Sequence, residues 1–185
     1  MAPWEEYRMK AINRALVPAR DVLTERKAAS PCIFLLHHAA ARKATQIIGD
    51  YITQNAQVDI YLDLSRAMDT LDDPFLQVLE EGFAWSSHTM IISPSDSSGN
   101  EYLTAIFEHM QNTSRPSSFL ILKDHHYFTV PSSLEILGGI KSLNEYLMRV
   151  SPENNTIIFN NPGYKGLLAH TAPRHPLDDY LNWND

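Results

Sequence analysis

The chain has 185 residues, of which 44% are hydrophobic, 20% charged and 10% aromatic, a composition typical of one globular domain and not of a disordered chain. Its 15 Lys and Arg residues against 22 Asp and Glu residues give a formal net charge of -7, which argues against a protein that coats nucleic acid or an anionic membrane. The single cysteine, Cys32, excludes an internal disulfide and a cysteine-based zinc site within this sequence.

The sequence also lacks the patterns that direct a chain to a membrane. The opening residues 1–7 carry two acids and no apolar core, and no later stretch approaches the roughly 18 apolar residues of a membrane span. We therefore expect a soluble, cytoplasmic protein whose partners include neither membrane nor nucleic acid.

Helices and strands alternate along the predicted order of elements. Apolar residues at helical spacing predict a first helix over residues 4–17, which Pro18 ends. Short apolar or β-branched runs then predict five strands, over 32–36, 58–62, 89–92, 119–122 and 156–159. Amphipathic patterns predict the helices between them, over about 40–54, 74–83, 103–110 and 133–147.

This alternation predicts the fold class. Right-handed crossovers between parallel strands place helices on both faces of a sheet, so we expect an α/β, flavodoxin-like, five-stranded parallel sheet over residues 31–160. Residues 1–30 form an N-terminal helical extension in this interpretation, and residues 161–185 form a C-terminal tail. We expect Tyr180 and Trp183 to pack the tail onto the domain, because exposed aromatic side chains are unfavourable.

Ligands of such sheets bind beyond the carboxyl ends of the strands, which directs attention to the loops at 37–43, 63–73 and 93–101. The chain contains no Gly-x-Gly-x-x-Gly, no Gly-x-x-x-x-Gly-Lys-Ser/Thr and no Gly-x-Ser-x-Gly sequence. A Rossmann-type dinucleotide fingerprint, a P-loop and a hydrolase nucleophile elbow are therefore excluded.

The histidines and the cysteine do not predict a metal site or a nucleophile. The pairs His37/His38 and His125/His126 are adjacent, and adjacent strand residues point to opposite faces, so neither pair is suited to hold one ion. We expect one histidine of each pair to face solvent and the other to pack beneath a loop. Cys32 begins an apolar strand and is expected to be an inert, buried thiol.

Three segments in order carry a resemblance to a known family. The first is Ile33 to Lys43, similar to a Phe-Leu-Ser-His opening but with Leu36 in place of Ser; the second is Val58 to Asp63, similar to Val-Asp-Val-Tyr-Leu-Asp. The third, Leu79 to Pro94, is similar to a helix, a serine and a strand that ends in Ser-Pro. Over residues 31–160 the chain thus resembles the TIR (Toll/interleukin-1 receptor) domains, in particular the short bacterial ones.

The resemblance implies an activity and a catalytic residue. Many bacterial TIR domains cleave the nicotinamide–ribose bond of NAD with a glutamate that begins the helix after the Ser-Pro turn, in a Ser-x-Trp-x-x-x-Glu pattern whose Trp is missing here. Glu101 matches that glutamate. Glu108 shares its helix face but lies about 10 Å further along the axis, too far to share a ligand with the strand ends. The helix dipole favours an acid in the first turn in any case, which is the structural alternative for Glu101.

Other residues at the carboxyl ends of the predicted strands are candidates for binding NAD, which is a substrate here and not a cofactor. Arg42 or Lys43, with amides of a helix start, could bind the pyrophosphate, although both could equally be a solvated helix flank. His37 would face the pocket if its strand ends at Leu36. The remaining candidates are His38, Ser93 and Asp63, and Asp63 could instead cap its own loop. No metal or bound cofactor is required.

The resemblance also implies partners. TIR sites are often completed between subunits through the loop after the second strand, here 64–73, so self-association is expected. Single-domain members of this length resemble the signal-producing enzymes of Thoeris-type antiphage defence, in which a phage component activates production of an ADP-ribose derivative that a separate effector detects. Two alternatives stay open: a noncatalytic TIR interaction module, and a nucleoside deoxyribosyltransferase-like enzyme. A flavodoxin-like electron carrier is disfavoured.

Overall fold

A computed structural model describes residues 31–56, 58–64, 68, 73–93, 106–108, 110–111, 115–123, 133–150 and 175–183. The helix expected over 4–17 and the strand expected over 156–159 lie outside these residues. No helix within the described ranges is long and apolar enough to cross a bilayer.

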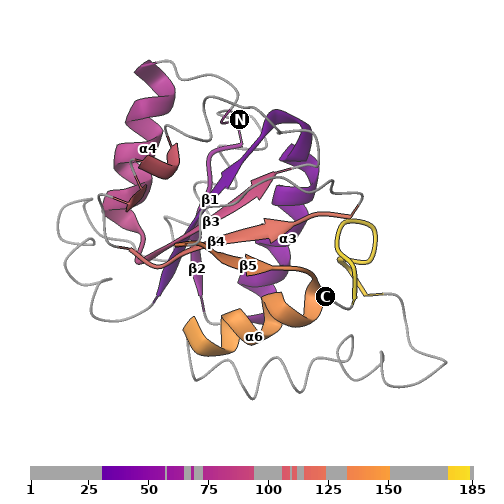
Figure 1. Ribbon diagram of the computed structural model, residues 1–185. Helices are drawn as coiled ribbons and strands as arrows, with labels where there is room; N and C mark the ends of the chain where they lie inside the picture. Colours follow the sequence, from indigo (N-terminus) through magenta and orange to yellow (C-terminus); the bar gives the residue numbers. More distant parts are fainter. Residues whose placement is uncertain are drawn as a thin grey trace.

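Five parallel strands form one sheet, in the order β2-β1-β3-β4-β5 (Figure 1). They are β1 (Cys32–His37), β2 (Asp59–Tyr61), β3 (His88–Ser93), β4 (Ser117–Ile121) and β5 (Glu135–Leu137). This order is the flavodoxin-like arrangement, in which the chain moves first to one side of β1 and then to the other. The α/β fold class predicted from the sequence is confirmed.

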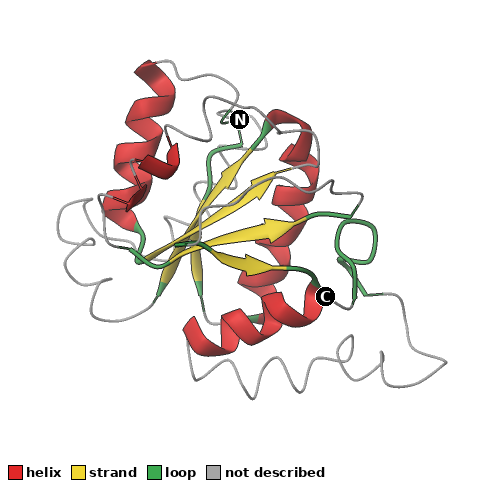
Figure 2. Cartoon of the chain, in the orientation of Figure 1, coloured by secondary structure: helices red, strands yellow, loops and turns green. Residues whose placement is uncertain are grey.

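Helices cover both faces of the sheet (Figure 2). On one face lie α3 (Arg42–Asn55), which follows the short 3-10 helix η1 (Ala39–Ala41), and α6 (Ile140–Val150). On the other lie α4 (Asp73–Trp85) and the helical residues 106–108 and 110–111.

The alternation of side chains along β1 divides the core into two layers. Ile33 and Leu35 pack under α3 and α6, whereas Phe34 and Leu36 pack under α4. All six side chains of β1 are buried, which explains the continuous apolar run that marks this strand in the sequence. The predicted helix stripes are buried as expected, including Phe75, Leu79 and Phe83 of α4.

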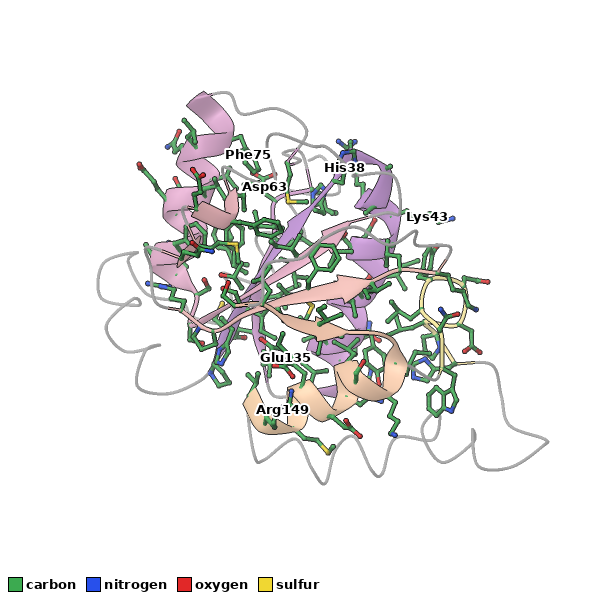
Figure 3. All side chains as sticks on the ribbon, viewed as in Figure 1. His38, Lys43, Asp63, Phe75, Glu135 and Arg149 are labelled. Atoms are coloured by element: carbon green, nitrogen blue, oxygen red, sulfur yellow. The ribbon has the colours of Figure 1, made fainter. Side chains whose placement is uncertain are left out.

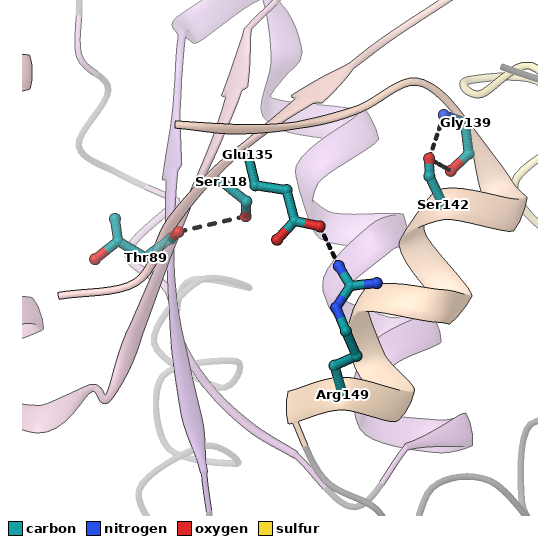
Figure 4. A network of polar contacts seen from close by, with 6 residues as sticks. All are labelled: Thr89, Ser118, Glu135, Gly139, Ser142 and Arg149. Carbon is teal, nitrogen blue, oxygen red and sulfur yellow. Dashed lines mark hydrogen bonds and ion pairs between the residues drawn. The ribbon is translucent and has the colours of Figure 1, made fainter. Parts of the chain in front are cut away.

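The sequence prediction was wrong between residues 133 and 139. The helix expected over 133–147 is instead β5 followed by α6, which begins only at Ile140. Two adjacent glycines at 138 and 139 are unfavourable in a helix interior, and α6 begins after them, where the Ser142 hydroxyl reaches back to accept from the amide of Gly139, the residue that precedes the helix (Figure 4). The fifth described strand is therefore β5.

The C-terminal segment His175–Trp183 docks on the carboxyl side of β4 and β5. Its Leu177 and Leu181 are fully buried, and its Tyr180 and Trp183 pack against the same core layer as α3 and α6. The carbonyl oxygen of Tyr180 accepts a hydrogen bond from the amide of Lys123, just beyond β4, at 2.7 Å. The segment thus covers one part of the carboxyl edge of the sheet.

Candidate functional site

The strand order identifies where a ligand pocket is expected. β1 and β3 are neighbours in the sheet, but the chain leaves them toward β2 on one side and β4 on the other. The crossover connections diverge at such a point and leave a crevice outside the carboxyl ends of the two strands. His37 ends β1 and Ser93 ends β3, so both sequence candidates lie at this switch point.

His37 joins the end of β1 to the chain that follows β2. Its Nε2 lies 3.2 Å from the carbonyl oxygen of Asp63, and its own carbonyl oxygen accepts from the amide of Met68 at 2.8 Å. One residue therefore holds both ends of the segment from Asp63 to Met68. β1 runs one residue further than the sequence predicted, and the His37 side chain is buried beneath the edge and does not face solvent.

The environment of His37 favours a neutral imidazole. Burial lowers the pKa of His37 below 6.5, while the carbonyl groups of His38 and Asp63 partly oppose this shift. The charge of Arg42 lowers the pKa further and that of Asp63 raises it. The charges of Arg42 and Asp63, two candidate binding residues, are therefore close enough to affect the pKa of His37.

His38 and the start of α3 form the adjoining part of the edge. The amide of His38 donates to Ile92 of β3 at 3.3 Å, and its carbonyl oxygen accepts from Ala41 at 2.9 Å. The amide of Arg42 donates to Ala39 within η1. Because the 3-10 turn uses the amides of Ala41 and Arg42, the helix start offers fewer amides to an anion than the sequence suggested.

The side chains of Arg42 and Lys43 extend from the first turn of α3 and are exposed. Figure 3 shows His38, Lys43 and Asp63 toward one end of the sheet, whereas Glu135 and Arg149 lie by α6. Arg42 and Lys43 are both cations in a chain whose formal net charge is -7.

The described residues of the connection after β2 are buried. Asp63 is 6% exposed, Leu64 is buried and Met68 is fully buried. Met68 packs with Phe34 and Phe75 in the core layer under α4. In the sequence Met68 is an isolated methionine in a polar stretch, and that pattern is too weak to predict that its side chain is buried in the core.

The acidic candidates are only partly described. Glu101 lies outside the described residues, as does the side chain of Ser93, although the backbone of Ser93 ends β3. Glu108 is exposed. Its neighbours Phe107 and Met110 line a cavity of about 180 Å³ together with Ser117, the first residue of β4. Glu108 therefore lies toward the amino end of β4, opposite the switch point.

Within the described parts of the chain, no cluster of three or more His, Cys, Asp or Glu side chains could hold a metal ion. Cys32 is buried at the amino end of β1, remote from the carboxyl edge. Arg42 and Lys43 are exposed cations that could contact an anionic ligand, whereas Asp63 at the end of β2 is only 6% exposed. At this edge the docked segment 175–183 contacts Lys123, just beyond β4, and Ile140, the first residue of α6.

Comparison of the chain with protein-family models, with curated proteins and with solved structures finds no match.

Proposed function

We propose that this protein is a TIR-like enzyme that cleaves the nicotinamide–ribose bond of NAD and produces an ADP-ribose derivative. One observation carries the proposal: two of the segments that resemble TIR domains, 33–43 and 79–94, contain β1 and β3, and the strand order makes these two strands neighbours at the switch point. Ligands of flavodoxin-like sheets bind at such a point.

Glu101 is the proposed catalytic acid, on the strength of the resemblance alone. The cations of Arg42 and Lys43 are the proposed contacts of the pyrophosphate, because both are exposed on the first turn of α3. His37 has a supporting role in this proposal, since its buried ring holds Asp63 and does not face the crevice.

The chemistry requires little besides one carboxylate. The bond from the ribose C1′ atom to the nicotinamide nitrogen breaks, and its electron pair leaves with nicotinamide, which becomes neutral. A carboxylate beside the ribose stabilises the developing oxocarbenium ion. Water then adds to C1′ and releases a proton, giving ADP-ribose, or a nucleophile within the pocket adds to it and gives a cyclic or conjugated product.

The same proposal extends to partners. An ADP-ribose derivative is suited to act as a diffusible signal that a separate effector detects, and a phage-derived activator and self-association would control its production, as in Thoeris-type antiphage defence. The wild-type chain should then turn over NAD faster per molecule as protein concentration rises, a dependence that a monomeric enzyme lacks.

The test is to incubate the purified chain with NAD over a range of protein concentrations and to measure nicotinamide and adenine-containing products by chromatography and mass spectrometry. Glu101→Gln is the test variant and Glu108→Gln is the matched control, because Glu108 is exposed and lies toward the opposite end of the sheet. We expect nicotinamide release that is lost in Glu101→Gln and retained in Glu108→Gln.

Two outcomes would contradict the proposal. Release that survives in Glu101→Gln would show that another group is the catalytic acid. Consumption of deoxynucleosides with NAD left intact would identify a deoxyribosyltransferase-like enzyme instead. The product mass separates hydrolysis from cyclisation and from conjugation.

A further inference from the structure

The docking of the segment His175–Trp183 depends on the protonation state of His175. His175 is 2% exposed, and its Nδ1 accepts a hydrogen bond from the amide of Leu177 at 3.1 Å. An amide can only donate, so Nδ1 must carry a lone pair and the imidazole must be neutral. Protonation would place two donors against each other and break this contact.

The other contacts of the segment depend on the turn that His175 forms. The carboxylate of Asp178 accepts from the amide of His175 at 2.9 Å, and the amides of Tyr180 and Leu181 both donate to the carbonyl oxygen of Leu177. This turn places Leu177 and Leu181 in the core. Loss of the Nδ1 contact would therefore weaken the arrangement that buries both leucines.

The segment is tied to two elements at the carboxyl edge. Lys123, which follows β4, donates its amide to Tyr180 and its ammonium group to the carbonyl oxygen of Asp178. The amide of Ile140, the first residue of α6, donates to the carbonyl oxygen of Asn182 at 2.9 Å. In Figure 1 the segment is the yellow loop beside the tips of β4 and β5.

The groups around His175 do not favour its charged form. The ring of Tyr51, on α3, lies 5.2 Å from the imidazole of His175 between centroids. The Tyr51 hydroxyl donates its hydrogen bond to Asn144 of α6 at 2.7 Å. The ring of Trp183, from within the segment, lies at a centroid distance of 5.9 Å and is tilted by 51° to the imidazole. The charged groups of the described chain that approach are Asp178 and, through Asp178, Lys123. Burial lowers the pKa of His175, and Asp178 partly opposes this.

Two other histidines with burial-lowered pKa values differ from His175 in the partners of their rings. Both ring nitrogens of His37 face carbonyl oxygens, which accept, so a protonated ring would keep both contacts. The Nδ1 of His88 lies 2.9 Å from the Ser87 hydroxyl, which can donate or accept. Of these three, only His175 loses a hydrogen bond when it is protonated.

We propose that residues 175–183 form an acid-released clamp on the carboxyl edge of β4, locked by the neutral imidazole of His175. Protonation releases the clamp and uncovers the apolar seat of Leu177 and Leu181, while the sheet stays folded. Release of the clamp would change the shape of the carboxyl edge at β4, the strand that pairs with β3. This inference does not depend on the proposed enzymatic function.

Hydrogen exchange of the full chain, followed by mass spectrometry at pH 7.5 and 5.5, tests the clamp. In the wild-type chain we expect exchange at Lys123, Ile140 and residues 177–181 to accelerate at pH 5.5 by up to about tenfold beyond the intrinsic effect of pH, with β1 still protected. His175→Asn keeps an acceptor near the Nδ1 position and cannot be protonated. At pH 5.5 this variant should retain protection of the same amides.

Two further variants keep the test decisive. Asp178→Asn retains an acceptor for the His175 amide but removes the charge that stabilises imidazolium within the docked segment, so the release midpoint should move to higher pH. His88→Gln should leave the wild-type response unchanged. Equal loss of protection in wild type and His175→Asn would overturn the clamp. So would a wild-type segment that stays protected until β1 itself opens, or an unshifted midpoint in Asp178→Asn.

Discussion

The Nε2 atom of His37 lies 3.2 Å from the carbonyl oxygen of Asp63, which binds the last residue of β1 to the chain just beyond β2. Both groups are buried. His37→Leu would leave the Asp63 carbonyl without this donor, so we expect a loss of about 1–3 kcal/mol in the free energy of unfolding. Urea denaturation at pH 7.5 measures it.

His37→Gln is the matched control for this change. A glutamine amide can reach roughly where Nε2 lies and donate to the same carbonyl oxygen, so it should recover more than half of the loss. If leucine and glutamine destabilise equally, volume and not the hydrogen bond explains the effect.

Arg42→Gln tests the proposed contact with the NAD pyrophosphate. Arg42 is exposed on the first turn of α3, so its removal should leave the free energy of unfolding nearly unchanged. We expect KM for NAD to rise about fivefold with little change in kcat, because an exposed charge contact contributes about 1 kcal/mol or less. Steady-state nicotinamide release gives both constants. Arg149→Gln, on α6, should leave KM unaltered.

Acid should destabilise the folded chain through two buried histidines and one half-buried histidine. Burial lowers the pKa values of His37, His88 and His175 below 6.5, so the unfolded chain binds more protons in the range just below that value. Their contribution to stability is complete above about pH 6.5 and is lost as the pH falls through 6.5 toward the folded-state pKa values. Each group contributes a slope of at most about 1.4 kcal/mol per pH unit. Urea midpoints measured from pH 8 to 5 should therefore fall below pH 6.5. A flat profile would contradict the assigned burial.

Gly82 of α4 should not tolerate a side chain. A Cβ atom there would overlap Cε1 and Cζ of Phe34, whose ring is held edge-on against Tyr61 and Phe83. Helix propensity alone predicts that Gly82→Ala stabilises the helix by about 1 kcal/mol. We expect the overlap to dominate and to destabilise by about 1–3 kcal/mol. Thermal unfolding decides the sign.

Ala84→Gly measures the effect of helix propensity alone on the free energy of unfolding, because Ala84 lies two residues away on the same helix and is exposed. It should destabilise by about 1 kcal/mol. A stabilised Gly82→Ala variant would mean that Phe34 can move aside.

The ion pair between Glu135 of β5 and Arg149 of α6 should contribute little (Figure 4). The two side chains are 47% and 56% exposed, so water and salt screen the attraction. Glu135→Gln should change the free energy of unfolding by less than about 0.5 kcal/mol. Urea denaturation in 0.05 and 0.5 M salt measures both the size and the screening. A loss above about 1 kcal/mol would show that the pair orders the edge strand.

Hydrophobic periodicity alone determined most of the architecture. The buried run of β1 and the stripes of α3 and α4 follow from side-chain spacing, because burial of apolar surface selects the period of the element that buries it. The alternation of these elements was enough to predict a parallel sheet. The carboxyl edge, with Arg42, Asp63 and Ser93, followed from that order.

Only the tertiary structure decided which chain segments meet. Leu134 and Leu137 keep a helical spacing with Ile140, yet pairing with β4 makes residues 135–137 a strand, because strand pairing depends on a distant partner. Likewise, nothing local shows that His37 binds Asp63 or that His175 contacts Tyr51. These contacts join residues separated by 26 and 124 positions in the chain, and such hydrogen bonds and ring contacts leave no periodic trace in a sequence.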